Sequence, residues 1–407
     1  MNSFRRNIPV LATSQALMMS SMTLILTTAA LVGLSLAPDK KLATIPVAII
    51  FIAVMCTSIP ASLLMERIGR KQGFLFATSF GITGSALAMY AILTSNFWMF
   101  VVSMFLVGMF NGFGNYFRFA AADAVEGDLK SKAISYVLAG GVIAAIVGPN
   151  LASVTRDSFD NAPFAASYAA LIIMYILIFL SLLFLKLPEQ SLSSEDNVNG
   201  VTSNRSMLEI VLQKKFLVAV IVGMFGYGVM TFLMTATPLA MQHHNHDFSE
   251  VSFTIQWHVL GMYVPSFFTG HLINRFGLNR VMFIGAVLAL LCIVVSLQGT
   301  TATHFWLALV LLGLGWNFMF IGATTLLTET YSLAEKAKTQ ALNDFLIFTT
   351  MTVASLSAGA LQHQFGWQMV NYGAIPFLVI VILSLLWLWN DKVNSTNTSS
   401  TCDETVT

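Results

Sequence analysis

Residues 65–71 read MERIGRK, a short charged stretch that lies between two long apolar runs. Residues 274–280, NRFGLNR, occupy the same place between two apolar runs in the second half of the chain. The residues that the two stretches share recur at an offset of 208 positions, Arg67 with Arg275 and Gly69 with Gly277. A charged turn that returns after half the chain predicts a protein built from two copies of one unit.

The composition of the 407 residues is that of a membrane protein. Hydrophobic residues make up 56% and charged residues only 10%, and the mean hydropathy is +0.77. Soluble domains carry about 25% charged residues, so this chain could not cover a surface that faces water. The net charge of +1 gives no reason to expect a nucleic-acid partner.

Long apolar runs recur along almost the whole chain. A helix that crosses a bilayer needs roughly 20 apolar residues, because lipid offers no hydrogen-bond partner to an exposed backbone amide. The runs that meet this need are 8–34, 42–65, 73–93, 97–122, 133–153, 164–186, 214–240, 251–273, 281–298, 305–328, 338–361 and 369–390. They predict an all-α integral membrane protein with 12 transmembrane helices in two six-helix pseudo-repeats.

Two polar segments divide the chain. They predict an N-terminal six-helix bundle over 1–190, a cytoplasmic linker over 191–210, a C-terminal six-helix bundle over 211–392 and a disordered cytoplasmic tail over 393–407. The linker and the tail are rich in Ser and Asn and lack the apolar residues that a core needs.

The Lys and Arg residues are distributed unequally between the two sides of the predicted bundle. Sixteen of the twenty fall in the loops of one side and three in the loops of the other, while Arg118 lies within a run. Because cytoplasmic loops carry an excess of Lys and Arg, we expect both termini in the cytoplasm. The expected location is the bacterial inner membrane.

The duplication extends beyond the charged turns. Asn111 matches Asn317, and Asp123 matches Glu329, each at an offset of 206. Two six-span halves in the same order are a transporter architecture, in which the substrate site lies near the middle of the membrane between the halves.

These features resemble the major facilitator superfamily of secondary transporters over residues 8–392. In that family the loop between the second and third spans reads roughly G-x-x-x-D-R-x-G-R-K; here residues 62–71 read SLLMERIGRK and residues 270–279 read GHLINRFGLN. Many exporters of the family carry G-x-x-x-G-P-x-x-G in the fifth span, and residues 144–152 read AAIVGPNLA. The resemblance implies a carrier that works by alternating access.

The resemblance also assigns a gating role to the charged turns. The expected gating residues are Glu66, Arg67, Gly69, Arg70 and Asp123 in the first half, Asn274, Arg275 and Glu329 in the second, and Gly148 and Pro149 in the fifth span. Ion pairs between opposite charges at the cytoplasmic ends of the spans would hold the cytoplasmic opening of the carrier closed. They would break when the two halves rock against each other. The alternative is that the charges snorkel at the membrane surface and that the Gly-Pro pair serves packing alone.

Arg118 is the most informative side chain for substrate binding. Asn111, Asn115 and Arg118 are spaced i, i+4, i+7 and share one helix face. A guanidinium within a span is costly unless it meets a partner or a wet cavity, and its planar fork of donors suits a carboxylate or a phosphate. The alternative is a structural ion pair with an acid on a neighbouring span.

Other runs carry polar or adaptable residues that we expect to contact a substrate. These are Gln15, Tyr227, Gln256 and Asn317. The chain also contains 21 Met residues, which suit a surface that repacks around ligands. For any single Met, helix packing is the simpler explanation.

Proton coupling needs a titratable group on the transport path. Asp344 and His258 are the candidates; Asp344 could instead pair near the inner surface. We expect no cofactor and no metal site, because the three Cys residues are far apart and the histidines at 243, 244 and 246 lie in a short loop.

The function that these features favour is secondary active transport of a small organic solute, anionic or amphipathic, with a proton as the coupling ion. The expected partners are that solute, the proton and the lipid bilayer, and a monomer is expected to suffice. The alternative is multidrug-type efflux of cationic or neutral amphiphiles by proton antiport. A more distant alternative, an intramembrane enzyme, would need paired catalytic groups that the sequence does not contain.

Overall fold

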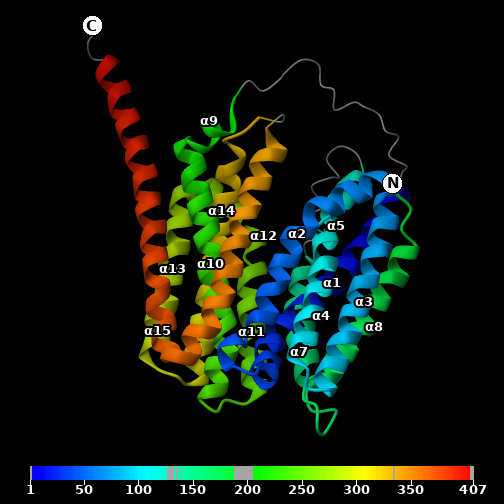
Figure 1. Ribbon diagram of the computed structural model, residues 1–407. Helices are drawn as coiled ribbons and strands as arrows, with labels where there is room; N and C mark the ends of the chain where they lie inside the picture. Colours follow the sequence, from blue (N-terminus) through cyan, green and yellow to red (C-terminus); the bar gives the residue numbers. More distant parts are fainter. Residues whose placement is uncertain are drawn as a thin grey trace.

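The computed structural model describes residues 2–125, 133, 136–137, 139–187, 205–332 and 335–403. Every regular element within them is a helix, which confirms the all-α prediction. Figure 1 shows two helical bundles side by side, the first blue to green and the second green to red. Most of the predicted linker, 191–210, lies outside the described residues.

The helices follow the order of the apolar runs. The first bundle contains α1 (Asn2–Leu36), the 3-10 helix η1 (Lys40–Leu42), α2 (Ile45–Ile68), α3 (Arg70–Leu93), α4 (Phe97–Gly114), α5 (Phe117–Asp123), α7 (Gly140–Thr155) and α8 (Ala165–Leu183). The second contains α9 (Met207–Val211), α10 (Lys214–His243), α11 (Phe248–Tyr263), α12 (Ser266–Phe276), α13 (Leu278–Gln298), α14 (Ala302–Thr328) and α15 (Lys336–Asp403).

Each of the twelve predicted runs is mainly helical where the structure describes it. Nine helices of the described part are long and apolar enough to cross a membrane. The other runs are α7, with 16 residues, the broken pair α11 and α12, and one part of α15. Gly366, with φ 76° and ψ −178°, interrupts the helical backbone of α15 between the last two runs.

The end of α15 enters the segment 393–407, for which the sequence predicts a disordered tail. The helix continues to Asp403 and projects beyond the bundle in Figure 1. No Pro or Gly follows Pro376, so no backbone-breaking residue ends the helix earlier.

The two charged turns lie at one end of the bundle, which we call the basic face. Its residues are Arg67, Arg70, Lys71, Arg275 and Arg280, at the junctions of α2 with α3 and of α12 with α13. Both ends of the chain lie at this end of the molecule in Figure 1.

Gly69 and Gly277 adopt nearly the same backbone conformation. Gly69 has φ 88° and ψ 146°, and Gly277 has φ 90° and ψ 149°. Each residue ends one helix and begins the next, with dihedral angles that are essentially restricted to glycine. The duplication in the sequence is therefore also present in the backbone.

Gly69→Ala is expected to lower the free energy of unfolding by about 1–3 kcal/mol, the usual cost of a non-glycine residue in such a region. No atom lies within 4 Å of a Cβ built on Gly69, so backbone strain alone would cause the loss. Gly270→Ala is the matched control: its Cβ would also meet open space, but the residue lies within helix α12, where Ala is preferred to Gly. Thermal unfolding in detergent measures both, and equal melting temperatures for the two variants would contradict the prediction.

Candidate functional site

A cavity of about 870 Å³ lies between the two bundles. Helices α1, α2, α4 and α5 line it from the first bundle, and α10, α11, α14 and α15 line it from the second. It reaches the basic face at Lys336, the first residue of α15. Small-molecule sites commonly enclose about 300–1,000 Å³, so the cavity has the size of a solute-binding site.

The bundles touch each other at the face opposite the basic one. The rings of Phe164 and Phe248 meet edge to face at 4.9 Å, and the Arg156 guanidinium lies 5.7 Å and 5.3 Å from their centroids. Phe164 holds this position with a φ of 69°, which is strained for a bulky residue. Nearby, the Ser252 hydroxyl donates a buried hydrogen bond of 2.5 Å to the Pro149 carbonyl.

The loop with the histidine cluster also lies at this opposite face. His246 Nδ1 is 2.8 Å from the Glu250 carboxylate, and Nε2 is 2.7 Å from the Thr300 carbonyl. Burial lowers the pKa of His246, but these two acceptors outweigh it and leave the pKa raised. The His246 ring therefore connects the start of α11 to the segment before α14.

The predicted stripe of Asn111, Asn115 and Arg118 lines the cavity. The Asn111 amide is buried and donates a hydrogen bond of 3.0 Å to the Val107 carbonyl of its own helix. Arg118 is exposed, and its guanidinium lies 4.9 Å from the Phe119 ring centroid. It forms no ion pair with any residue that the structure describes, so the alternative of a structural pair finds no partner there.

Gln15 and Tyr227 also line the cavity, as predicted. Gln15 is 7% exposed and Thr231, another lining residue, is 3% exposed. Gln15 Oε1 and Thr231 Oγ1 have no hydrogen-bond partner among the described residues. Buried polar atoms normally have a partner, so these two are available to a polar solute.

Asp344 is the one acidic residue among the lining residues that the structure describes. It belongs to α15, faces the cavity and interacts electrostatically with Arg118 from the other bundle. The Asn343 amide donates to it at 3.2 Å. The cavity therefore combines one acid and one arginine from opposite bundles.

Gln256 and His258 are not brought to the cavity, although both were expected on the transport path. The Asn150 amide of α7 donates a hydrogen bond of 2.7 Å to Gln256 Oε1, which joins the two bundles. His258 is fully buried, with Nδ1 2.8 Å from the Leu309 carbonyl of α14. Both side chains pack α11 against a neighbouring helix.

Asn317 is also absent from the lining, because it fills the break between α11 and α12. Its amide donates to the Met262 carbonyl at 2.7 Å and to the Ser266 hydroxyl at 2.6 Å. Its oxygen accepts a hydrogen bond of 2.6 Å from Thr269. The helical hydrogen bonds are interrupted near Pro265, which has no backbone N–H. The Asn317 side chain supplies hydrogen bonds to residues on both sides of this break.

The predicted gate is formed only in part. Arg70 and Asp123 make an ion pair between α3 and α5. In the second bundle Glu329 pairs with Lys215 at 2.7 Å and not with Arg275, because Leu278 stands 208 positions after Arg70. Each of these two ion pairs joins helices or helix ends of a single bundle, so neither pair connects the two bundles. Glu66, Arg67, Asn274 and Arg275 are exposed at the basic face.

The Gly148-Pro149 pair serves two different contacts. A Cβ on Gly148 would lie 2.8 Å from the Ser20 carbonyl of α1, so the glycine permits close packing within the first bundle. The Pro149 carbonyl accepts the hydrogen bond from Ser252 and so links this bundle to the second.

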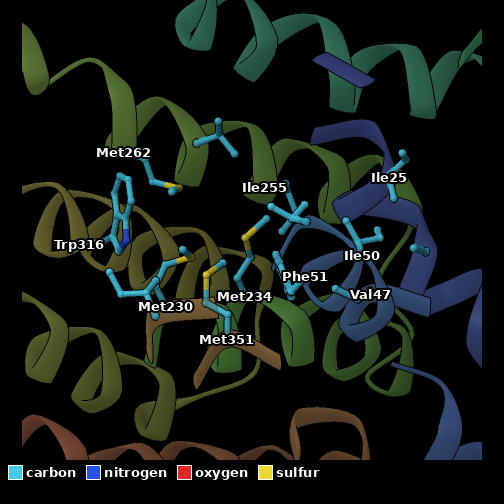
Figure 2. Close-up of a cluster of buried hydrophobic side chains, with 14 of the residues drawn as sticks. Ile25, Val47, Ile50, Phe51, Met230, Met234, Ile255, Met262, Trp316 and Met351 are labelled. Atoms are coloured by element: carbon cyan, nitrogen blue, oxygen red, sulfur yellow. The ribbon is translucent and has the colours of Figure 1, made fainter. Parts of the chain in front are cut away.

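Methionines make up much of the lining, to an extent that the sequence did not reveal. The lining methionines are Met18, Met19, Met22, Met55, Met230, Met234, Met262 and Met351. Figure 2 shows Met230, Met234, Met262 and Met351, from α10, α11 and α15, on the same side of the cluster as Trp316. Trp316 stacks on Phe320 with centroids 4.9 Å apart. The total of 21 Met residues was the available signal, but it did not locate them.

Arg118→Lys is expected to reduce transport about tenfold or more, the equivalent of one charge-assisted hydrogen bond, because Lys lacks the planar fork of donors. Arg118 is exposed to the cavity, so the amount of folded protein should not change. Uptake assays and size-exclusion chromatography measure the two quantities. Loss of folded protein would instead indicate a structural role.

Comparison with known proteins agrees with this architecture. The family model of the Major Facilitator Superfamily matches residues 11–244 and 219–406. A riboflavin transporter, RfnT, of Brucella anthropi is 38% identical over 94% of this chain and 95% of its own length. An uncharacterised transporter of the same type from Bacillus subtilis, YddS, is 26% identical over 94% and 91%.

Solved structures have the same fold at low sequence identity. A D-xylose–proton symporter superposes with a TM-score of 0.75 at 14% identity, over 94% of this chain and 97% of that one. A bacterial homologue of the lysosomal transporter Spinster gives a TM-score of 0.70 at 15% identity, over 94% and 96%. With a family model that covers both bundles and a relative that matches nearly end to end, the chain belongs to the Major Facilitator Superfamily.

Proposed function

We propose that this transporter carries riboflavin or a closely related flavin across the bacterial inner membrane, with a proton as the coupling ion. The observation that carries the proposal is the 38% identity to a riboflavin transporter over nearly the full length of both chains. The cavity supports it, because aromatic rings, thioethers and amide groups surround a space large enough for a flavin.

The basic face is the cytoplasmic face in this proposal. The excess of Lys and Arg there supports that orientation. The cavity then opens to the cytoplasm and is closed on the outside by the Phe164–Phe248 contact. Rocking of the bundles would break that contact and close the basic face. One chain supplies both walls of the cavity, so a monomer suffices.

The test uses a bacterial strain that neither synthesises riboflavin nor imports it. Expression of the chain is expected to restore growth at low external riboflavin and to give saturable uptake of labelled riboflavin. Gly270→Ala, which changes a residue remote from the cavity lining, should behave like the unmodified chain. No growth and no uptake, with the protein present in the membrane, would reject flavin import.

Efflux of amphiphilic compounds is the second candidate. The methionine-rich lining favours it, because flexible thioethers adapt to varied ligands. The same cells, exposed to cationic dyes and to external riboflavin, separate the two functions: efflux lowers dye accumulation, whereas flavin import raises intracellular riboflavin.

A further inference from the structure

The lining of the central cavity changes in character with depth. At a rise of 1.5 Å per residue, Arg118 lies roughly 8 Å from the end of α5 and Asp344 roughly 12 Å from the start of α15, both at the basic face. Asn115, Asn343 and Gln340 line the same outer part. The mouth of the cavity is therefore rich in charges and amides.

The closed end of the cavity is mainly apolar. By the same rise, Met351 lies roughly 22 Å from the start of α15 and Met234 roughly 30 Å from the start of α10. Figure 2 shows these two side chains close together, with Phe51 of the first bundle facing them. Thioether and ring atoms offer a flat aromatic solute favourable contact, and they offer hydroxyl groups no strong hydrogen-bond acceptor.

A few polar side chains line the closed end, among them Gln15, Thr23 and Thr231, and Gln15 Oε1 has no hydrogen-bond partner among the described residues. The Thr23 hydroxyl donates to the Met19 carbonyl at 2.8 Å within its own helix. The Thr231 hydroxyl has no partner among the described residues. A hydroxyl donates and accepts, so Thr231 can bind either a carbonyl or an N–H at the edge of a ring.

Riboflavin has a corresponding division of polarity. It joins a flat, fused aromatic ring system, with carbonyl and N–H groups along one edge, to a flexible ribityl chain that carries hydroxyl groups. On the basis of the proposed function, we propose that the ring system occupies the methionine-lined closed end, with its polar edge at Thr231, and that the ribityl chain extends to Asn115, Arg118 and Asp344 at the mouth.

The opposite orientation would leave hydroxyl groups among thioethers and would cost them their hydrogen bonds to water. It would also place the aromatic ring between Arg118 and Asp344, where only the one polar edge of the ring could replace the hydration that the charges lose. The amphipathic lining thus selects one orientation of an amphipathic solute.

The test compares riboflavin with lumiflavin, which has the same ring system but a methyl group in place of the ribityl chain. Binding to the purified full-length protein is measured by the change in flavin fluorescence. Asn115→Ala is expected to weaken riboflavin binding at least fivefold and to leave lumiflavin binding within twofold. Met351→Ala is expected to weaken both ligands at least fivefold and to a similar extent.

Two further variants serve as controls for effects of the substitutions on folding. Met351→Leu keeps the side-chain volume and is expected to weaken both ligands equally, to a smaller extent. Met369→Ala changes an exposed methionine of the same helix outside the cavity lining and should leave both affinities unchanged.

The outcomes separate the orientation from the function. If Asn115→Ala weakens lumiflavin as much as riboflavin, or if Met351→Ala weakens riboflavin alone, the orientation is wrong while flavin binding stands. If the unmodified protein binds neither flavin, the proposed function fails and the orientation fails with it.

Discussion

Asp344→Asn is expected to abolish accumulation of solute against its gradient while solute exchange across the membrane continues. Asp344 is the one acid among the described lining residues and interacts with Arg118 across the cavity. A carboxyl group there can take up a proton in one state and release it in the other, whereas an amide of the same shape cannot. In the proposed proton-coupled carrier, removal of the titratable group would uncouple the solute from the proton gradient.

Proteoliposomes with an imposed pH gradient distinguish the two activities. Accumulation should fall at least tenfold in Asp344→Asn, and counterflow exchange of labelled solute should remain within about threefold, because the amide keeps the shape of the side chain. Asp160→Asn is the control, since Asp160 is an exposed acidic residue outside the cavity lining. Undiminished accumulation by Asp344→Asn would exclude Asp344 as the coupling residue.

Asn317→Ala is expected to lower the free energy of unfolding by about 2 kcal/mol or more. The variant loses three hydrogen bonds to the broken segment between α11 and α12. Side-chain hydrogen bonds between membrane helices contribute roughly 0.6–1.7 kcal/mol each. The Met262 carbonyl would be left without the Asn317 amide at a helix break.

Asn111→Ala is the matched variant at the corresponding position of the first bundle. Among the described residues its amide donates only to the Val107 carbonyl of its own helix, and the residue lines the cavity. We expect a change in unfolding free energy within about 0.5 kcal/mol, together with weaker transport. Thermal unfolding and uptake are measured on both variants. Asn317→Ala should lower the melting temperature clearly, whereas Asn111→Ala should reduce uptake with little change in melting temperature. Equal destabilisation by the two variants would contradict the structural role of Asn317.

The sequence predicted the architecture well because the bilayer imposes strong constraints on it. Apolar runs of the required length located the helices, and the recurrence of Gly69 as Gly277 located two turns with one backbone conformation. Charges and amides within a span are costly, which is why Arg118, Asn111 and Asn115 could be assigned to the cavity.

The roles that depend on contacts between helices could not be read from the sequence. Asn317 matches Asn111 in the repeat, yet the break at Pro265 gives it backbone and hydroxyl partners. Gln256 and His258 are polar residues within an apolar run, as the lining residues are, but their side chains bond to α7 and α14. Periodicity identifies a face of a helix and does not identify which neighbour that face meets.

The methionine lining has a chemical consequence for the working life of the carrier. Oxidants convert methionine to its sulfoxide, a polar group that no longer behaves as an apolar surface, and reductases reverse the reaction. Eight methionines line one water-accessible cavity, so a single oxidised side chain would place a strong dipole on the path of the solute. Carrier molecules damaged in this way would remain folded in the membrane and stop carrying solute until they are repaired.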